Sequence, residues 1–279
     1  MLAAPLWYKT RYRPEDYSEL YNAGFEYVEI SLDYPWPFKM RDRLDEQLSI
    51  IRKTGMKTGV HMPWRDISLL SPYAPIREGG IKVLEELLEP ITNIEAEYAV
   101  LHVTSRENMK AKDIDETIEW VSTRLKEVID RYREAGVMVV LENLASGPSS
   151  LKSIILKLAR GASSKICFDL AHLIARELSR GVNTREGVRE KLVEWASSIG
   201  ELTTLVHLHG VVASEGKVLE HLPLTREEME TYADILRMIL SKQERVVVGL
   251  EIFYKDTARR KASVKHLISS ARLVLEALR

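Results

Sequence analysis

Short apolar runs, many of them rich in β-branched residues, alternate along the chain with longer segments in which apolar residues recur every three or four positions. The short runs predict strands, and the longer segments predict helices with one apolar face. The expected strands span residues 3–8, 25–32, 57–61, 98–103, 137–142, 165–169, 203–208 and 246–252. The clearest helix covers 114–132, where Ile118, Val121 and Leu125 lie on one face.

Expected strands and helices follow one another in turn, and this order predicts parallel strands joined by right-handed crossovers. Eight such units predict a single (β/α)8 TIM barrel, and the 279 residues match the roughly 250 that this fold needs. We expect residues 1–279 to form one domain, since no linker or low-complexity segment interrupts them. An open doubly wound sheet is the alternative, but the chain lacks the G-x-G-x-x-G turn that such sheets often carry.

Six of the expected strands carry a side chain that can bind a metal ion at their carboxyl end or one residue before it. These residues are His61, His102, Glu142, Asp169, His207 and Glu251, and two further histidines, His172 and His221, lie just beyond such ends. A TIM barrel brings the carboxyl ends of its strands to one mouth, where its active site lies. Polar side chains gathered there would be costly to bury without a shared ion. Imidazole and carboxylate donors suit zinc, manganese or cobalt, so the pattern predicts a divalent-metal site at the C-terminal ends of the strands.

Three neighbouring positions have other interpretations. His209 alternates with His207 along a strand, so we expect it to point to the other side or to lie at the edge of the loop. Cys167 is expected to fill the core rather than to act as a nucleophile. Asp169 has a second interpretation as the cap of the helix that follows it.

The charge balance argues against non-specific binding to nucleic acid or to an anionic membrane, because the net charge is -1. No apolar run reaches the roughly 18 residues of a membrane span. The first residues lack the pattern of a signal peptide, and a single cysteine excludes an intramolecular disulfide. We therefore expect a cytoplasmic protein. A charged fraction of 29%, with few amide side chains, indicates a heat-adapted source.

The order of these motifs resembles the xylose isomerase-like TIM-barrel superfamily, which includes sugar isomerases, sugar epimerases and the endonuclease IV type of DNA-repair enzyme. The resemblance rests on His102 and on the segments H-M-P at 61–63, L-E-N at 141–143, F-D-L-A-H at 168–172, V-H-L-H at 206–209, E-H-L-P-L at 220–224 and G-L-E at 249–251. It extends over residues 25–255. The order of the motifs is more specific for the superfamily than for any one reaction.

The resemblance implies two sets of ligands. Isomerases and epimerases of this superfamily hold one ion, and their four ligands match Glu142, Asp169, His207 and Glu251, while His172 matches a histidine that contacts the substrate. Endonuclease IV holds three zinc ions with nine ligands, of which eight are matched here by His61, His102, Glu142, Asp169, His172, His207, His221 and Glu251. The ninth is an aspartate two residues before His221, and this chain has Leu219 there, so the third ion's ligand set is incomplete unless Glu220 substitutes.

From the sequence we favour an isomerase or epimerase that acts on a small sugar, ketose or polyol derivative with one zinc or manganese ion. Glu142 and Glu251 would move a proton next to a carbonyl, and His172 would orient a hydroxyl group. The alternative is an endonuclease IV-like phosphodiester hydrolase with two or three ions and a nucleic-acid substrate, or another metal-dependent hydrolase. The resemblance also implies a homo-oligomer.

Overall fold

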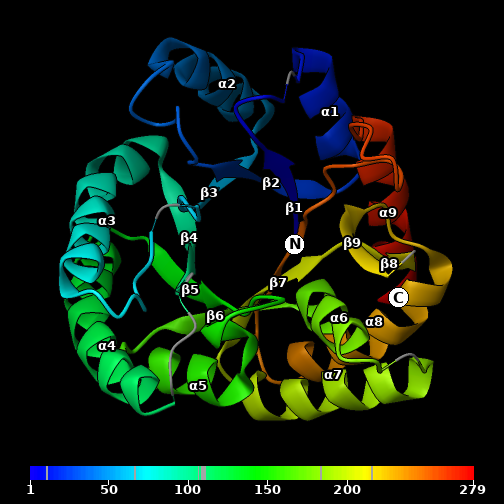
Figure 1. The fold of residues 1–279 in the computed structure, drawn as a ribbon. Coiled ribbons are helices and arrows are strands. Elements are labelled where there is room, and N and C mark those ends of the chain that lie inside the picture. Colours follow the sequence, from blue (N-terminus) through cyan, green and yellow to red (C-terminus); the bar gives the residue numbers. More distant parts are fainter. Residues whose placement is uncertain (11, 66, 106, 108–110, 183, 215) are drawn as a thin grey trace. The chain divides into compact units, whose positions relative to one another are not determined.

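The structure is a computed structural model that describes residues 1–279 except 11, 66, 106, 108–110, 183 and 215 and the side chains of 111–113. Strands and helices alternate along the described residues, as Figure 1 shows. Eight of these strands close into a barrel in the order β1-β10-β7-β6-β5-β4-β3-β2. The predicted (β/α)8 TIM barrel is confirmed.

The observed strands lie within a few residues of the predicted ones. The barrel strands are β1 (Leu2–Leu6), β2 (Phe25–Ser31), β3 (Lys57–His61), β4 (Ala96–His102), β5 (Met138–Glu142), β6 (Lys165–Asp169), β7 (Thr203–Leu208) and β10 (Val247–Leu250). The helices are α1 (Pro14–Asn22), α2 (Arg41–Thr54), α3 (Ala74–Ile94), α4 (Ala111–Glu134), α5 (Lys152–Gly161), α6 (Leu170–Ser179), α7 (Arg185–Ile199), α8 (Arg226–Leu240) and α9 (Val264–Ala277), with a short 3-10 turn at Pro148–Ser150.

The chain forms two compact units. Unit 1 comprises Met1–Pro5, Arg11–Val28 and Phe168–Arg279, and unit 2 comprises Leu6–Thr10 and Glu29–Cys167. The division passes through β1, β2 and β6 rather than through a linker. That residues 1–279 act as one domain stays a prediction.

Unit 2 is built on neighbouring parallel strands. β3 pairs with β4, β4 with β5, and β5 with the start of β6. Their apolar residues, such as Val60, Val100 and Leu141, are fully buried, as expected of strands covered on both faces. Figure 1 shows α3, α4 and α5 along the outer side of β3, β4 and β5. The carboxyl ends of β3, β4 and β5 thus come to one edge.

The long helices of unit 2 follow their apolar pattern. In α4 the predicted stripe is buried from Ile118 to Tyr132, and Gly136 follows the helix with φ +82°. In α3 Pro90 lies inside the helix. Among the described residues, no helix has the length and apolarity needed to cross a membrane.

Unit 1 contains a second set of parallel strands, in which β10 lies between β1 and β7. The helices α6, α7 and α8 of this unit are capped by side chains of the kind that the sequence rules favour. Thr225 and Glu228 form a reciprocal capping box at the start of α8, and Asp169 accepts a hydrogen bond from the backbone N–H of His172 at the start of α6. The alternative interpretation of Asp169 as a helix cap is therefore confirmed.

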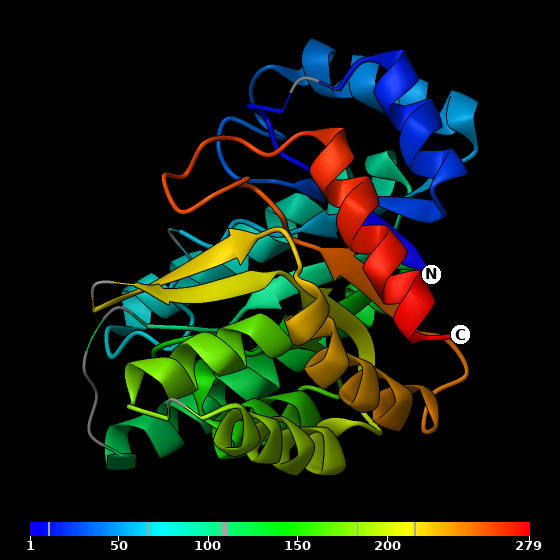
Figure 2. The ribbon, with the colours of Figure 1, turned by 90° about the vertical axis from the view of Figure 1, so that its right-hand side faces the viewer.

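The segment after β7 corrects the sequence analysis, which expected no strand between residues 208 and 246. It forms an antiparallel hairpin of β8 (Gly210–Ser214) and β9 (Lys217–Leu222), drawn as the two yellow arrows in Figure 2. Gly216 lies at the turn with φ +74°, a value that favours glycine. The hairpin fixes His221 on β9, so its position is set by strand pairing.

Candidate metal centre

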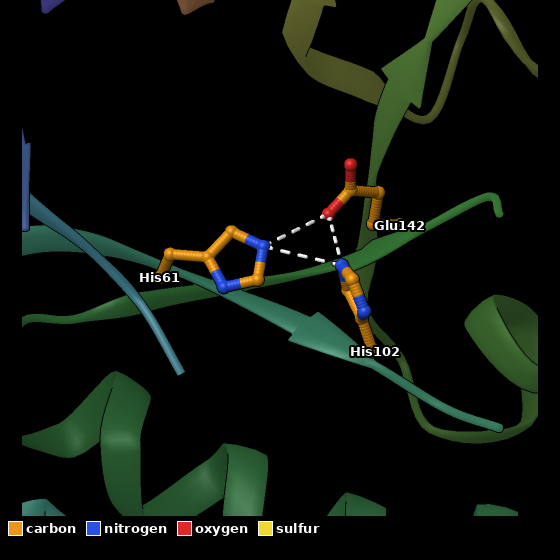
Figure 3. A group of neighbouring side chains, drawn as sticks. All are labelled: His61, His102 and Glu142. Carbon is orange, nitrogen blue, oxygen red and sulfur yellow. Dashed lines mark hydrogen bonds and ion pairs between the residues drawn. The ribbon is translucent and has the colours of Figure 1, made fainter. Parts of the chain in front are cut away.

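Three candidate ligands of unit 2 lie at the ends of neighbouring strands. His61 ends β3, His102 ends β4 and Glu142 ends β5. Because His102 and Glu142 are partners in the register of two parallel strands, their side chains lie on the same side of the sheet. Figure 3 shows all three side chains pointing toward one another, and we call them the His61 cluster.

Three donor atoms converge in the His61 cluster. Oε2 of Glu142 lies 2.7 Å from Nε2 of His102 and 3.3 Å from Nε2 of His61, and the two nitrogens are 3.1 Å apart. His61 donates its Nδ1–H to the carbonyl oxygen of Met62 at 2.9 Å, which leaves a lone pair on Nε2. Such a hydrogen bond at the far nitrogen is how proteins orient a metal-binding histidine.

The His61 cluster fits a divalent cation. The ligand atoms of a tetrahedral zinc ion are about 3.4 Å apart when each lies about 2.1 Å from the metal. The separations of the two imidazole nitrogens from each other and of Nε2 of His61 from Glu142 are within about 0.3 Å of this value, and the shorter one between His102 and Glu142 would widen by about 0.7 Å. Glu142 is fully buried and His61 is nearly so, so a cation would offset the cost of burying this carboxylate.

A second set of donors lies in unit 1. Asp169 ends β6, His207 lies on β7, and Glu251 directly follows β10. Donor atoms of these three buried residues lie within 4.8 Å of one another, and Nδ1 of His207 is 3.6 Å from Oε1 of Glu251. β7 and β10 are paired in parallel, which aligns the ends that carry the last two residues. We call these three residues the Asp169 cluster.

His172 and Glu220 flank the Asp169 cluster. His172 lies in the first turn of α6, and its Nδ1 donates to Oε1 of Glu220 at 2.7 Å. Its Nε2 therefore carries a lone pair, and it lies 3.8 Å from Oδ2 of Asp169. Glu220 thus orients His172 as the carbonyl of Met62 orients His61.

His221 completes this side of unit 1. It adopts a left-handed backbone conformation with φ +62°, which is uncommon for a residue with a side chain and often marks a functional site. Its Nδ1 donates to the backbone carbonyl of Glu251 at 3.2 Å. Burial, with the neighbouring His209 and His172, holds the pKa of His221 well below its usual value. Its ring is therefore neutral near pH 7, which is the form that binds metals.

The family model for xylose isomerase-like TIM barrels matches residues 18–273, nearly the whole chain. The chain belongs to this family. A probable endonuclease 4 of Natranaerobius thermophilus is 33% identical over 119 residues, which cover 40% of this chain and 40% of that relative. The match therefore spans well under two thirds of the curated relative's length.

Two solved structures show the same family fold. A protein from Thermus thermophilus, solved after soaking with zinc chloride, has a TM-score of 0.65 at 24% identity, over 99% of this chain and 98% of that one. A D-tagatose 3-epimerase-like protein has a TM-score of 0.70 at 15% identity, over 99% and 96% of the two chains. At these identities the likeness concerns the fold.

The ligand sets that the family resemblance implies are distributed over both units. Unit 2 brings together His61, His102 and Glu142, while Asp169, His172, His207, His221 and Glu251 belong to unit 1. The isomerase-type set takes Glu142 from unit 2 and its other three members from unit 1. That all four bind one ion stays a prediction.

The structure also shows where Leu219 lies, the residue that departs from the family's three-ion pattern. Leu219 lies on β9 opposite Val212, where endonuclease IV would have an aspartate. Glu220, considered as a substitute ligand, instead uses Oε1 to hold Nδ1 of His172. The structure therefore gives Glu220 the part of an orienting group.

His209 is the residue that sequence reasoning considered but did not count among the candidate ligands. It lies between β7 and β8, is fully buried, and has a donor atom within reach of both Asp169 and His172. Burial is the largest influence and acts to lower its pKa, but the charge and hydrogen bonding of Asp169, together with the charge of Glu220, outweigh it and the pKa is raised. The strict alternation of a strand could not reveal this position, because β7 ends one residue earlier.

Proposed function

We propose that this chain is a divalent-metal-dependent phosphodiester hydrolase of the endonuclease IV type. The His61 cluster carries this proposal. A one-ion isomerase uses the four-ligand set that the resemblance implies, and His61 and His102 have no part in it. Here each unit supplies three converging donors of its own, so the chain offers ligands for at least two ions.

Zinc or manganese bound to these donors would supply a Lewis acid that neutralises charge on a phosphoryl group and activates a water molecule. The side chains have distinct tasks. Glu142 contributes the negative charge of the His61 cluster, and His61 is oriented by the carbonyl of Met62. In unit 1 Asp169 and Glu251 contribute the carboxylates, and Glu220 orients His172. The match to a probable endonuclease 4 also favours this activity.

A metal-dependent isomerase or epimerase of a small sugar is the second candidate. Leu219 and a net charge of -1 favour it, because both argue against a three-ion enzyme that binds a polyanion. Glu142 and Glu251 would then be the catalytic acid and base, with His172 contacting a hydroxyl group. The ranking drawn from the sequence is reversed because the donor atoms of His61 and His102 converge on Glu142.

Metal content separates the two candidates. We expect at least two ions per chain by plasma mass spectrometry of the protein loaded with zinc or manganese and then desalted. His102→Ala should remove one ion, because it takes one of the three donors from the His61 cluster. His266→Gln, a change on α9 away from both clusters in sequence, is the matched control and should leave the count unchanged.

Activity provides the second readout. The loaded protein should nick a duplex that contains an abasic site, and His102→Ala should lower that rate by at least about 100-fold if one of two ions is lost. A count of one ion, no nicking, and proton exchange into a ketose in heavy water would instead support the isomerase.

A further inference from the structure

His209 is a fully buried imidazole that neither family ligand set includes. Its backbone is anchored, because the hydroxyl of Tyr232 donates to its carbonyl oxygen at 3.1 Å. Its side chain lies beside Asp169, His172 and His221, and it is a candidate for a further imidazole ligand in unit 1. An imidazole binds a metal only through a ring nitrogen that carries no proton. The position of the proton on the His209 ring therefore decides whether His209 can be a ligand.

The Nδ1 atom of His209 is a hydrogen-bond acceptor. The backbone N–H of His221 donates to it at 3.0 Å. The carbonyl oxygen of Gly210 is also near this atom, but at the longer distance of 3.4 Å. A backbone amide keeps its proton, whereas an imidazole nitrogen can be protonated or not, so the amide of His221 determines the tautomer. Nδ1 is therefore the nitrogen without a proton.

The proton of the neutral ring must then be on Nε2. This nitrogen lies 3.5 Å from Oδ2 of Asp169, and both side chains are fully buried. A carboxylate oxygen only accepts hydrogen bonds, so an Nε2–H facing it is favourable. An Nε2 that carries a proton has no lone pair to give to a metal ion.

The other oriented histidines have the opposite arrangement. In His61, His172 and His221 the Nδ1 atom faces an oxygen that can only accept, namely a backbone carbonyl or a carboxylate. Each of these rings therefore donates through Nδ1 and keeps a lone pair on Nε2. Among the histidines whose Nδ1 partner the structure describes beside the two clusters, His209 alone is reversed.

We infer that His209 is a positioning residue, fixed as the Nε2–H tautomer by the amide of His221, that orients the carboxylate of Asp169 and does not itself bind the ion. The inference rests on the proposed function in one respect, namely that Asp169 is a ligand. The inference connects the hairpin to the metal centre. Strand pairing places His221 on β9, and the backbone amide of His221 in turn fixes which nitrogen of His209 carries the proton that faces Asp169.

Nitrogen NMR of protein labelled with ¹⁵N-histidine tests the tautomer directly. At a pH above the raised pKa of His209, where the ring is neutral, we expect this ring, identified by its absence in His209→Gln, to show a protonated Nε2 and an unprotonated Nδ1 in the metal-free protein. Addition of zinc should leave that pattern in place, whereas histidines that bind the ion should change. A proton on Nδ1 of the neutral ring in the metal-free protein, or a zinc-induced change at Nε2, would overturn the inference.

Zinc affinity, measured by competition with a chelating dye, gives a readout other than activity. His209→Ala should weaken the unit 1 site by about 10–100-fold, the usual cost of losing a group that orients a ligand. The number of ions should not change. His209→Gln should recover part of the affinity, because its amide can accept from His221 and donate to Asp169. His266→Gln should match the unaltered protein.

The outcomes separate this inference from the proposed function. Loss of one ion in His209→Ala would make His209 a ligand and contradict the inference. Unchanged affinity with reduced stability would make it a structural residue only, which also contradicts it. If the protein bound no metal at all, the proposed function would fail, and the tautomer in the metal-free protein would still decide whether the amide of His221 fixes the ring.

Discussion

His61, His172 and His221 each donate from Nδ1 to a fixed oxygen, and this single contact determines what the rest of the ring can do. For His61 and His221 the acceptor is a backbone carbonyl, so the orientation follows from the fold itself. For His172 it is the carboxylate of Glu220, which can be changed without altering the backbone. Some of the groups that orient the candidate ligands are therefore not ligands themselves.

The lowered pKa of His221 predicts an acid-sensitive stability in the metal-free protein. The unfolded chain takes up a proton on this ring near its ordinary pKa of about 6.5, while the folded protein resists protonation until a lower pH. Stability is therefore lost as the pH falls below about 6.5, by up to about 1.4 kcal/mol per pH unit from this group. His209, whose pKa is raised, contributes instead a loss of stability as the pH rises above about 6.5.

Urea unfolding of chelator-treated protein at pH 5, 6 and 7 measures this effect. The free energy of unfolding should fall more steeply with acid in the unaltered protein than in His221→Gln, which removes the group with the lowered pKa. Parallel curves for the two proteins would show that His221 titrates as it does in the unfolded chain.

At the scale of the element, the strands were predicted within a few residues because their apolar runs are local and bounded by polar residues. β3, β6 and β7 have the predicted bounds. The hairpin was missed because residues 210–222 carry polar and apolar residues without a buried face of their own, and β8 is largely exposed. As a result, the sequence could assign His221 to the ligand list but could not show its contact with His209.

Gly59 lies on β3 at a position that has no room for a side chain. A Cβ atom built there would lie 2.1 Å from Cζ of Tyr98, whose hydroxyl donates to the buried carboxylate of Glu29 at 2.9 Å. We expect Gly59→Ala to lower the free energy of unfolding by about 1–3 kcal/mol, because the ring must move within a packed core.

Gly79 offers the matched control in the same unit. It lies on the exposed face of α3, and a Cβ atom there would meet nothing within 4 Å. Gly79→Ala should raise stability by about 0.5–1 kcal/mol, since alanine favours the helix. Both variants can be compared by urea unfolding, and equal effects would contradict the packing argument for Gly59.

For the whole molecule, the sequence predicted the barrel because its strands alternate with helices, and it named eight candidate ligands because these lie at or just beyond strand ends. That these eight residues bind metal ions stays a prediction. The family match from residue 18 to 273 agrees with that fold. The sequence could not rank the ligands, because ranking depends on contacts such as the 2.7 Å between His172 and Glu220, which join residues 48 positions apart. The cytoplasmic location and the homo-oligomer stay predictions.

Metal ions should contribute to the stability of the whole protein if each unit binds one. A ligand at 100 times its dissociation constant adds about 2.7 kcal/mol per site, which corresponds to roughly 5–10 °C in Tm for a chain of this size. Chelation should therefore lower Tm by at least this amount, and zinc should restore it. Magnesium should restore little, because both clusters contain imidazole nitrogens, which magnesium binds poorly. A Tm that does not change on chelation, or that magnesium restores as well as zinc, would contradict the prediction that each unit binds an ion through imidazole nitrogens.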